Sequence, residues 1–226
     1  MLYEYKFWHQ LTQPSSLSYS LENSEDGKLK GYKKAFWGIF GFTLLFFIVR
    51  NIWGVNTDEL TYLLANQEID RYSFARLVSL GSAVLFGVLF FVIHYYIITY
   101  FISLLTELPY RWIQKVQLYV IGILVLEKVV ELIIFAVAGF ATPFTMFSLA
   151  PMTAYLYYHD YLLYFLNSLT VGTVMAIWVQ YTFLSQWVEE SKKSLLFKLI
   201  LIHVVIAIIV AIFNILPISE WLKGGM

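Results

Sequence analysis

Three charged side chains in the middle of a long apolar segment are the residues best suited to chemistry. Glu127, Lys128 and Glu131 lie within residues 110–140, a segment that is otherwise mostly aliphatic and aromatic. At the centre of a membrane helix, each charge costs about 2.5–3.5 kcal/mol on insertion scales. We therefore predict that one face of this helix turns away from lipid, towards protein or water.

Helical geometry shows which residues share that face. At about 100° per residue, Glu131 follows Glu127 by about 40°, and Lys128 follows it by about 100°. The same arc contains Gln117, Val120, Leu124 and Ala138. This face is expected to pack against other helices or to line a polar space.

Two interpretations of the charged cluster remain open. It is a proton, cation or partner site, or it neutralises itself through i,i+3 and i,i+4 pairs that hold a helix bundle in register. His94 falls at a depth comparable to that of Glu127, so we include it in the candidate intramembrane polar cluster. His203 and Asn214 form a candidate secondary polar face.

Composition places the chain among integral membrane proteins. Hydrophobic residues make up 60% of the chain, aromatic residues 19% and charged residues 13%, far from the averages of soluble domains. The 15 basic and 15 acidic residues cancel, so we expect membrane lipids as partners and no nucleic acid. The absence of cysteine excludes thiolate catalysis, cysteine-ligated metals and disulfides.

We predict an all-α fold with five transmembrane helices in a bundle. The predicted spans occupy about 35–55, 77–105, 112–140, 161–187 and 195–216. A polar N-terminal segment, 1–34, precedes the membrane domain, 35–216, and a short outer tail, 217–226, follows it. The tyrosine-rich stretch 141–160, which contains Pro143 and Pro151, is re-entrant, interfacial or a loop.

Lysine and arginine residues near the ends of the spans give the orientation. Most lie in the N-terminal segment and in two connections, at Arg111/Lys115 and at Lys192/Lys193/Lys198. Five spans place these three regions on one side of the membrane. We therefore predict a multi-pass plasma-membrane protein with its N-terminus in the cytoplasm and its C-terminus outside.

The flanking segments carry further expectations. The opening aromatic residues of the N-terminal segment either dock on the membrane surface or on a partner, or belong to a loosely ordered tail with some interfacial aromatics, which is the favoured alternative. The first outer loop, 56–76, is expected to contain a short amphipathic helix. Small residues predict packing faces at Ser79/Ala83/Gly87, Ser168/Gly172/Ala176 and His203/Ala207/Ala211.

Motifs for known enzyme chemistry are missing from the sequence. There is no HExxH motif, no GxSxG motif and no glycine-rich phosphate loop. The four histidines are scattered rather than paired at ligand spacing. We therefore predict a protein that is not an enzyme, with no catalytic residues, no metal and no cofactor.

The layout resembles the Yip family, membrane proteins named for their interaction with small GTPases, in its bacterial branch. The resemblance covers residues 33–216 and includes PYRWIQKVQLYVIG at the start of the third span, the proline-containing loop after it, and SLTVGTVMAIWVQYTFLSQWVEESKKS. It implies a membrane scaffold that assists other membrane proteins, with an ABC-type exporter as an expected partner. Signature residues of the eukaryotic members are not evident, so the resemblance does not extend to a GTPase partner.

Two functions from different classes follow. The first is a non-enzymatic scaffold or assembly factor that binds another integral membrane protein or membrane complex. The second is a small ion- or proton-coupled transporter or channel that uses Glu127, Lys128 and Glu131. The sequence leaves the partner, any transported ligand and the oligomeric state open.

Overall fold

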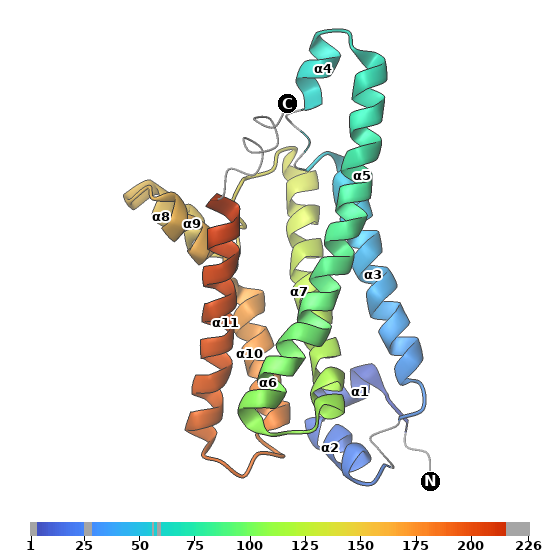
Figure 1. Ribbon diagram of the computed structural model, residues 1–226, viewed down its shortest axis with the longest axis vertical. Coiled ribbons are helices and arrows are strands. Elements are labelled where there is room, and N and C mark those ends of the chain that lie inside the picture. The colour runs from blue at the N-terminus through green and yellow to red at the C-terminus, as the bar shows by residue number, and fades with distance from the viewer. Residues whose placement is uncertain (1–3, 25–28, 56, 58–59, 216–226) are drawn as a thin grey trace.

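A computed structural model describes residues 4–24, 29–55, 57 and 60–215 of the chain. Across these residues the structure is helical, with two isolated β-bridges and no strand (Figure 1). This confirms the all-α prediction. The predicted outer tail, 217–226, lies outside the described residues.

Three helices in the described part of the chain are long and apolar enough to cross a membrane. They are α3 (Tyr32–Trp53), the continuous helix Ile69–Thr106 and α11 (Lys192–Ile215). The second consists of α5 (Ile69–Val92), the π-helix η3 (Ile93–Ile97) and α6 (Ile98–Thr106). The protein is therefore a helical membrane protein, whereas the count of five spans remains a prediction.

The continuous helix Ile69–Thr106 is longer than its predicted span, 77–105. With 38 residues it measures about 57 Å at roughly 1.5 Å per residue, well beyond the roughly 30 Å of hydrocarbon in a bilayer. Its first turns therefore extend out of the bundle towards the short helix α4 (Thr61–Ala65), as Figure 1 shows. Much of the predicted polar loop is thus helix.

Helix α7 (Tyr110–Ala138) carries the predicted charged cluster and is the central helix of the fold. Pro109 precedes it with φ −57°, a value that suits the start of a helix. Gly139 ends it with φ +77°, the left-handed conformation that glycine adopts at helix C-termini. The first half of α7 is enclosed, since Ile113, Val116 and Tyr119 have no exposed surface.

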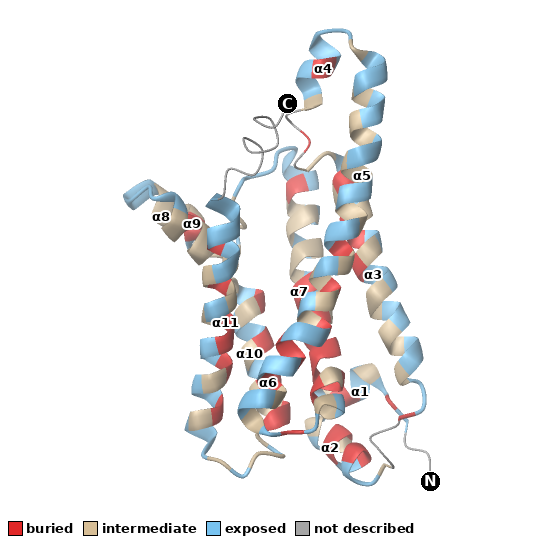
Figure 2. Ribbon diagram, viewed as in Figure 1, coloured by how far each residue is buried: buried red, intermediate tan, exposed pale blue. Residues whose placement is uncertain are grey.

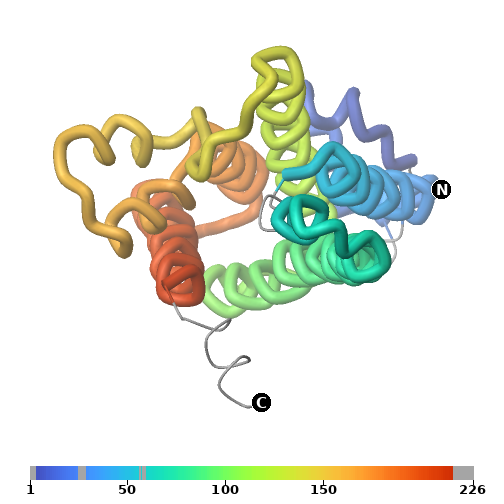
Figure 3. Tube along the Cα trace, turned by 90° about the horizontal axis from the view of Figure 1, so that it is seen from above, coloured from blue at the N-terminus to red at the C-terminus, as the bar shows by residue number. Residues whose placement is uncertain are grey.

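The segment predicted as the fourth span, 161–187, is divided in two. It forms α9 (Asp160–Ser168) and α10 (Val171–Leu184), with Thr170 in an extended conformation between them. Helix α8 (Ala150–Leu156) precedes α9 and lies at the side of the bundle (Figure 3), whereas α9 packs against α11 with Leu163 fully buried. No proline marks the division, so the sequence alone predicts one continuous helix here.

The N-terminal segment corrects the expectation of a loosely ordered tail. It forms α1 (Phe7–Thr12) and α2 (Pro14–Glu22), and the Tyr5 N–H group donates a hydrogen bond to the Lys30 carbonyl at 2.8 Å. Leu17 and Leu21 are fully buried in the main hydrophobic core. These helices are therefore part of the folded domain.

The helices alternate in direction. In Figure 1, α3, α7 and α11 run one way, and α5, α6 and α10 run the other way. We call the end with α1, α2 and the beginnings of α7 and α11 the basic end, because it carries Arg111, Lys192 and Lys193. The opposite end, with residues 54–55 and 139–143, is the loop end. Buried residues concentrate around α6, α7 and α10 towards the basic end (Figure 2).

Most of the predicted small-residue faces pack against other helices. A side chain at Gly87 would lie 3.1 Å from Leu44 and Phe47 of α3. The other buried members are Gly172, Ala176, His203, Ala207 and Ala211. Small residues thus allow close helix approach where lipid offers no hydrophobic drive for association.

A polar contact at the basic end joins α11 to two other segments. Lys198 Nζ donates to Glu190 Oε2 at 2.7 Å and to the Leu105 carbonyl, near the end of α6, also at 2.7 Å. The Ser194 hydroxyl donates to the same Glu190 oxygen at 2.8 Å. These hydrogen bonds, first that of Lys198, lower the pKa of Glu190 from its ordinary value.

Candidate functional site

Glu127 closes the N-terminal end of α10. Its Oε1 accepts a hydrogen bond from the Gly172 N–H group at 2.7 Å, and its Oε2 accepts one from the Thr170 hydroxyl at 2.8 Å. The first N–H groups of a helix have no partner within the helix, and its N-terminus attracts negative charge. A Cβ atom at Gly172 would collide with this carboxylate. Glu127 is therefore a cap supplied by a neighbouring helix.

Polar groups also hold the interruption between α9 and α10. The Asn167 side-chain oxygen accepts from the Thr145 N–H group at 2.7 Å, and the Val171 N–H group donates to the Phe147 carbonyl at 3.0 Å. Thr170 forms a capping box with Thr173. Non-helical backbone at membrane depth requires such internal partners. The loop before α8 and the interruption thus form one hydrogen-bonded unit.

Glu131, Lys128 and Arg50 lie next to this unit. Glu131 Oε1 accepts a hydrogen bond from the Met146 N–H group at 3.2 Å. Glu131 also attracts both Lys128 and Arg50 electrostatically. Neither cation has a hydrogen bond or a close ion pair with any residue that the structure describes.

These charged groups line a polar cavity of about 130 Å³, which we call the charged cavity. Its lining is Arg50, Glu127, Lys128 and Glu131 with Thr142, Thr145, Asn167, Thr170 and several apolar residues. Arg50 also lines a cavity of about 270 Å³ between α3 and α5. Towards the loop end, a third cavity of about 460 Å³ shares Val55, Thr142 and Pro143 with the charged cavity. The three cavities therefore adjoin.

The predicted site residues separate into two groups. Glu127, Lys128 and Glu131 line the charged cavity, whereas His94 does not. His94 Nδ1 is hydrogen-bonded to the Phe90 carbonyl at 2.9 Å, and its ring packs on Phe90 at 4.3 Å. It interacts with Lys128 and His203 only electrostatically.

The predicted secondary polar face is occupied by contacts within α11. His203 Nδ1 is hydrogen-bonded to the Leu199 carbonyl at 3.0 Å. Asn214 Nδ2 donates to the Val210 carbonyl at 2.8 Å, and the residue is exposed. No group of three histidine, cysteine, aspartate or glutamate residues suited to a metal is found in the part of the chain that the structure describes.

The predicted arc of α7 does face protein over most of its length. Gln117 and Val120 have no exposed surface, and Leu124 is buried, whereas Ala138 is exposed at the end of the helix. Gln180 Nε2 of α10 donates to Gln117 Oε1 at 3.0 Å. Helix α10 thus covers the polar face of α7.

Sequence reasoning missed Arg50, Asn167 and Thr170. Arg50 lies near the end of the first predicted span, where a basic side chain can reach the interface, and Glu131, which shares the cavity with it, comes from a helix distant in sequence. Thr170 and Thr173 have the spacing of a capping box, which was the one available signal. This spacing indicates a cap only where a helix begins, and the sequence does not show that a helix begins at Val171.

Comparisons with protein-family models, with curated proteins and with solved structures found no match to this chain. The resemblance to the Yip family therefore stays a prediction. Function has to be inferred from the described contacts, cavities and surfaces.

Proposed function

We propose that the protein is a non-enzymatic integral membrane scaffold or assembly factor that binds another integral membrane protein. The observation that carries this proposal is the projecting arm, which we define as residues 146–159, including α8. The arm begins with hydrogen bonds of Met146 to α7 and of Phe147 to the start of α10, and its far part lies at the side of the bundle, next to α9 (Figure 3). An ABC-type exporter is the partner that the Yip resemblance implies.

The arm presents an uncharged, aromatic surface. Tyr155 is 93% exposed, Leu156 79% and Tyr158 71%. Residues 141–159 contain no lysine, arginine, aspartate or glutamate. Interface cores are enriched in tyrosine and methionine and depleted in charged residues. Such a surface supports docking of a partner within or at the edge of the membrane.

The helix directions support the proposed five-span topology. An alternation of α3, the α5–α6 helix, α7, α10 and α11 places the N-terminal helices and the starts of α7 and α11 at the basic end (Figure 1). By the positive-inside rule this end faces the cytoplasm. The arm and the charged cavity then lie towards the outer side.

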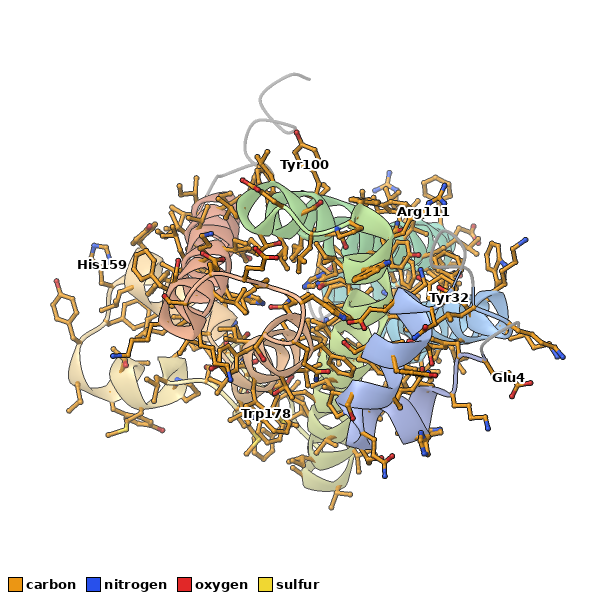
Figure 4. The ribbon with its side chains drawn as sticks, turned by 90° about the horizontal axis from the view of Figure 1, so that it is seen from below. Glu4, Tyr32, Tyr100, Arg111, His159 and Trp178 are labelled. Atoms are coloured by element: carbon orange, nitrogen blue, oxygen red, sulfur yellow. The ribbon has the colours of Figure 1, made fainter. Side chains whose placement is uncertain are left out.

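Site-specific photo-crosslinking in native membranes tests the scaffold proposal. A photoreactive amino acid at Tyr155 is expected to give one discrete adduct with a second membrane protein. The matched control is Trp178 of α10, which is 64% exposed and lies on the outer surface of the bundle (Figure 4). Trp178 is expected to label lipid and to give no discrete protein adduct.

Binding of the captured protein must also depend on the side chains of the arm. For this test the photoreactive group is placed at Leu156, and the double variant Tyr155→Ala/Tyr158→Ala is introduced. The double variant is expected to reduce the yield of the adduct several-fold. It is also expected to reduce the amount of the partner assembled in the membrane. Equal labelling at positions 155 and 178, or assembly of the partner unaffected by the double variant, would contradict the proposal.

A second candidate function is an ion- or proton-coupled transporter that uses Glu127, Lys128 and Glu131. The interruption between α9 and α10 favours it, because transporters often bind anionic groups at the N-terminus of a broken helix. Here the anionic group is Glu127 itself. Purified protein in liposomes is expected to conduct protons or cations, and Glu127→Gln with Glu131→Gln to abolish the flux. Absent flux, or flux that the double variant leaves unchanged, argues against transport.

A further inference from the structure

The charged cavity contains more hydrogen-bond donors than its neighbours use. Arg50 carries five N–H donors and Lys128 three, and both side chains line the cavity without a partner among the described residues. Asn167 accepts hydrogen bonds through its side-chain oxygen. Its N–H₂ group has no hydrogen bond to the described part of the chain and adds two further donors.

The acceptors in the cavity are mostly occupied. Both oxygens of Glu127 accept hydrogen bonds from the beginning of α10. One oxygen of Glu131 accepts from the Met146 N–H group. The second oxygen of Glu131 cannot satisfy two cations and an amide. Arg50 and Lys128 are half-buried, and their donors have no hydrogen-bond partner among the described residues, so an additional anionic group in the cavity would complete the site.

The size of the cavity limits what that group can be. At about 130 Å³ of space open to water, the cavity has room for several water molecules, since one needs roughly 10–15 Å³ on this measure. It suits a group the size of a phosphate rather than a whole lipid. The adjoining cavity of about 460 Å³, lined by Trp53 and Phe140, has room for the rest of a larger ligand.

We propose that the charged cavity binds a phosphate-type oxyanion through Arg50 and Lys128, with Asn167 as a third donor. The planar guanidinium group suits two oxygens of one phosphate, and the ammonium group acts as a point charge beside it. The oxyanion is the headgroup of an anionic phospholipid or free phosphate. The proposal does not rest on the scaffold function, although the Met146 N–H group at the base of the arm donates a hydrogen bond to Glu131 of the cavity.

Titration of the purified full chain tests the site. Delipidated protein in neutral detergent is titrated with inorganic phosphate, short-chain phosphatidylglycerol or short-chain phosphatidylcholine, and binding is measured by calorimetry. Saturable binding of one phosphatidylglycerol per chain, without binding of phosphate, identifies a lipid headgroup site. Binding of both anions identifies a site for the phosphate group itself. Phosphatidylcholine is expected to bind more weakly than phosphatidylglycerol.

Chemical protection locates the binding without any substitution. Acylation of lysine amines is followed by mass spectrometry in the unaltered chain. The bound anion is expected to slow acylation of Lys128 several-fold while leaving Lys193, an exposed lysine at the basic end, unchanged. This measurement keeps its meaning even where a variant does not fold.

Substitutions then separate the named donors from general charge effects. Arg50→Gln and Lys128→Gln are each expected to weaken anion binding about 10- to 100-fold, the loss typical of one charged hydrogen-bonding partner. Lys128→Arg retains binding, and so does the control Lys193→Gln. The proposal is overturned if neither anion binds saturably, if Lys128 is not protected, or if both glutamine variants bind as the unaltered chain does.

Discussion

Replacing Glu127 with alanine is expected to lower the free energy of unfolding by about 3 kcal/mol. The substitution leaves the Gly172 N–H group and the Thr170 hydroxyl without their acceptor. An unsatisfied buried polar group costs about 1–3 kcal/mol, and the hydrogen bonds lost here involve a charged acceptor. The measurement is reversible unfolding of the purified protein in mixed micelles.

Two further variants determine whether this loss comes from capping. Glu127→Gln keeps an oxygen that accepts from Gly172, so we expect about half of the alanine effect. Glu131→Ala removes one hydrogen bond of 3.2 Å, worth about 1 kcal/mol, together with the attraction of Glu131 for Lys128 and Arg50, but it leaves the cap of α10 in place. If alanine at positions 127 and 131 destabilised the protein equally, general charge removal rather than capping of α10 would be the cause.

The same principle accounts for other charged residues in this apolar chain. Arg76 of α5 donates to the Asn51 carbonyl of α3 at 3.1 Å, close to the end of that helix. Lys198 of α11 donates to the Leu105 carbonyl near the end of α6. Helix ends expose backbone groups that lipid cannot satisfy. A charged side chain from a neighbouring helix stabilises them and fixes the relative positions of the two helices.

Sequence periodicity was sufficient for those features that depend on one helix. Apolar runs gave the class, the helical content and the approximate positions of α3, α7 and α11. The arc through Gln117, Val120 and Leu124 was predicted to face protein, and these residues are buried. Each of these properties depends on residues that are neighbours on one helix.

Features that depend on contacts between distant segments could not be predicted. The chain between Ser168 and Val171 leaves the helix where partners from other segments satisfy the backbone: the Phe147 carbonyl accepts from the Val171 N–H group, and Glu127 accepts from the Gly172 N–H group. Arg50 joins the site only because α3 packs beside α7. His94 was placed near Glu127 by depth alone, and depth does not determine which helices are neighbours.

The N-terminal segment shows the same limitation. Its polar residues and Pro14 indicated a tail, yet α2 buries Leu17 and Leu21 on one side. An i,i+4 pair of leucines in a polar segment is a weak signal on its own. It becomes decisive only in the folded chain, where α2 packs against α10 and the two leucines join the main hydrophobic core.

Replacing Leu17 with alanine is therefore expected to destabilise the folded domain by about 3 kcal/mol, as large-to-small changes in a packed core do. Leu17 has no exposed surface and belongs to the main hydrophobic core. The matched control is Leu64→Ala in α4, where the side chain is 45% exposed, and a loss below about 1 kcal/mol is expected. Unfolding in mixed micelles measures both. A loose tail would make the Leu17 variant as stable as the unaltered chain, so equal stability would show that α2 is not part of the cooperative fold.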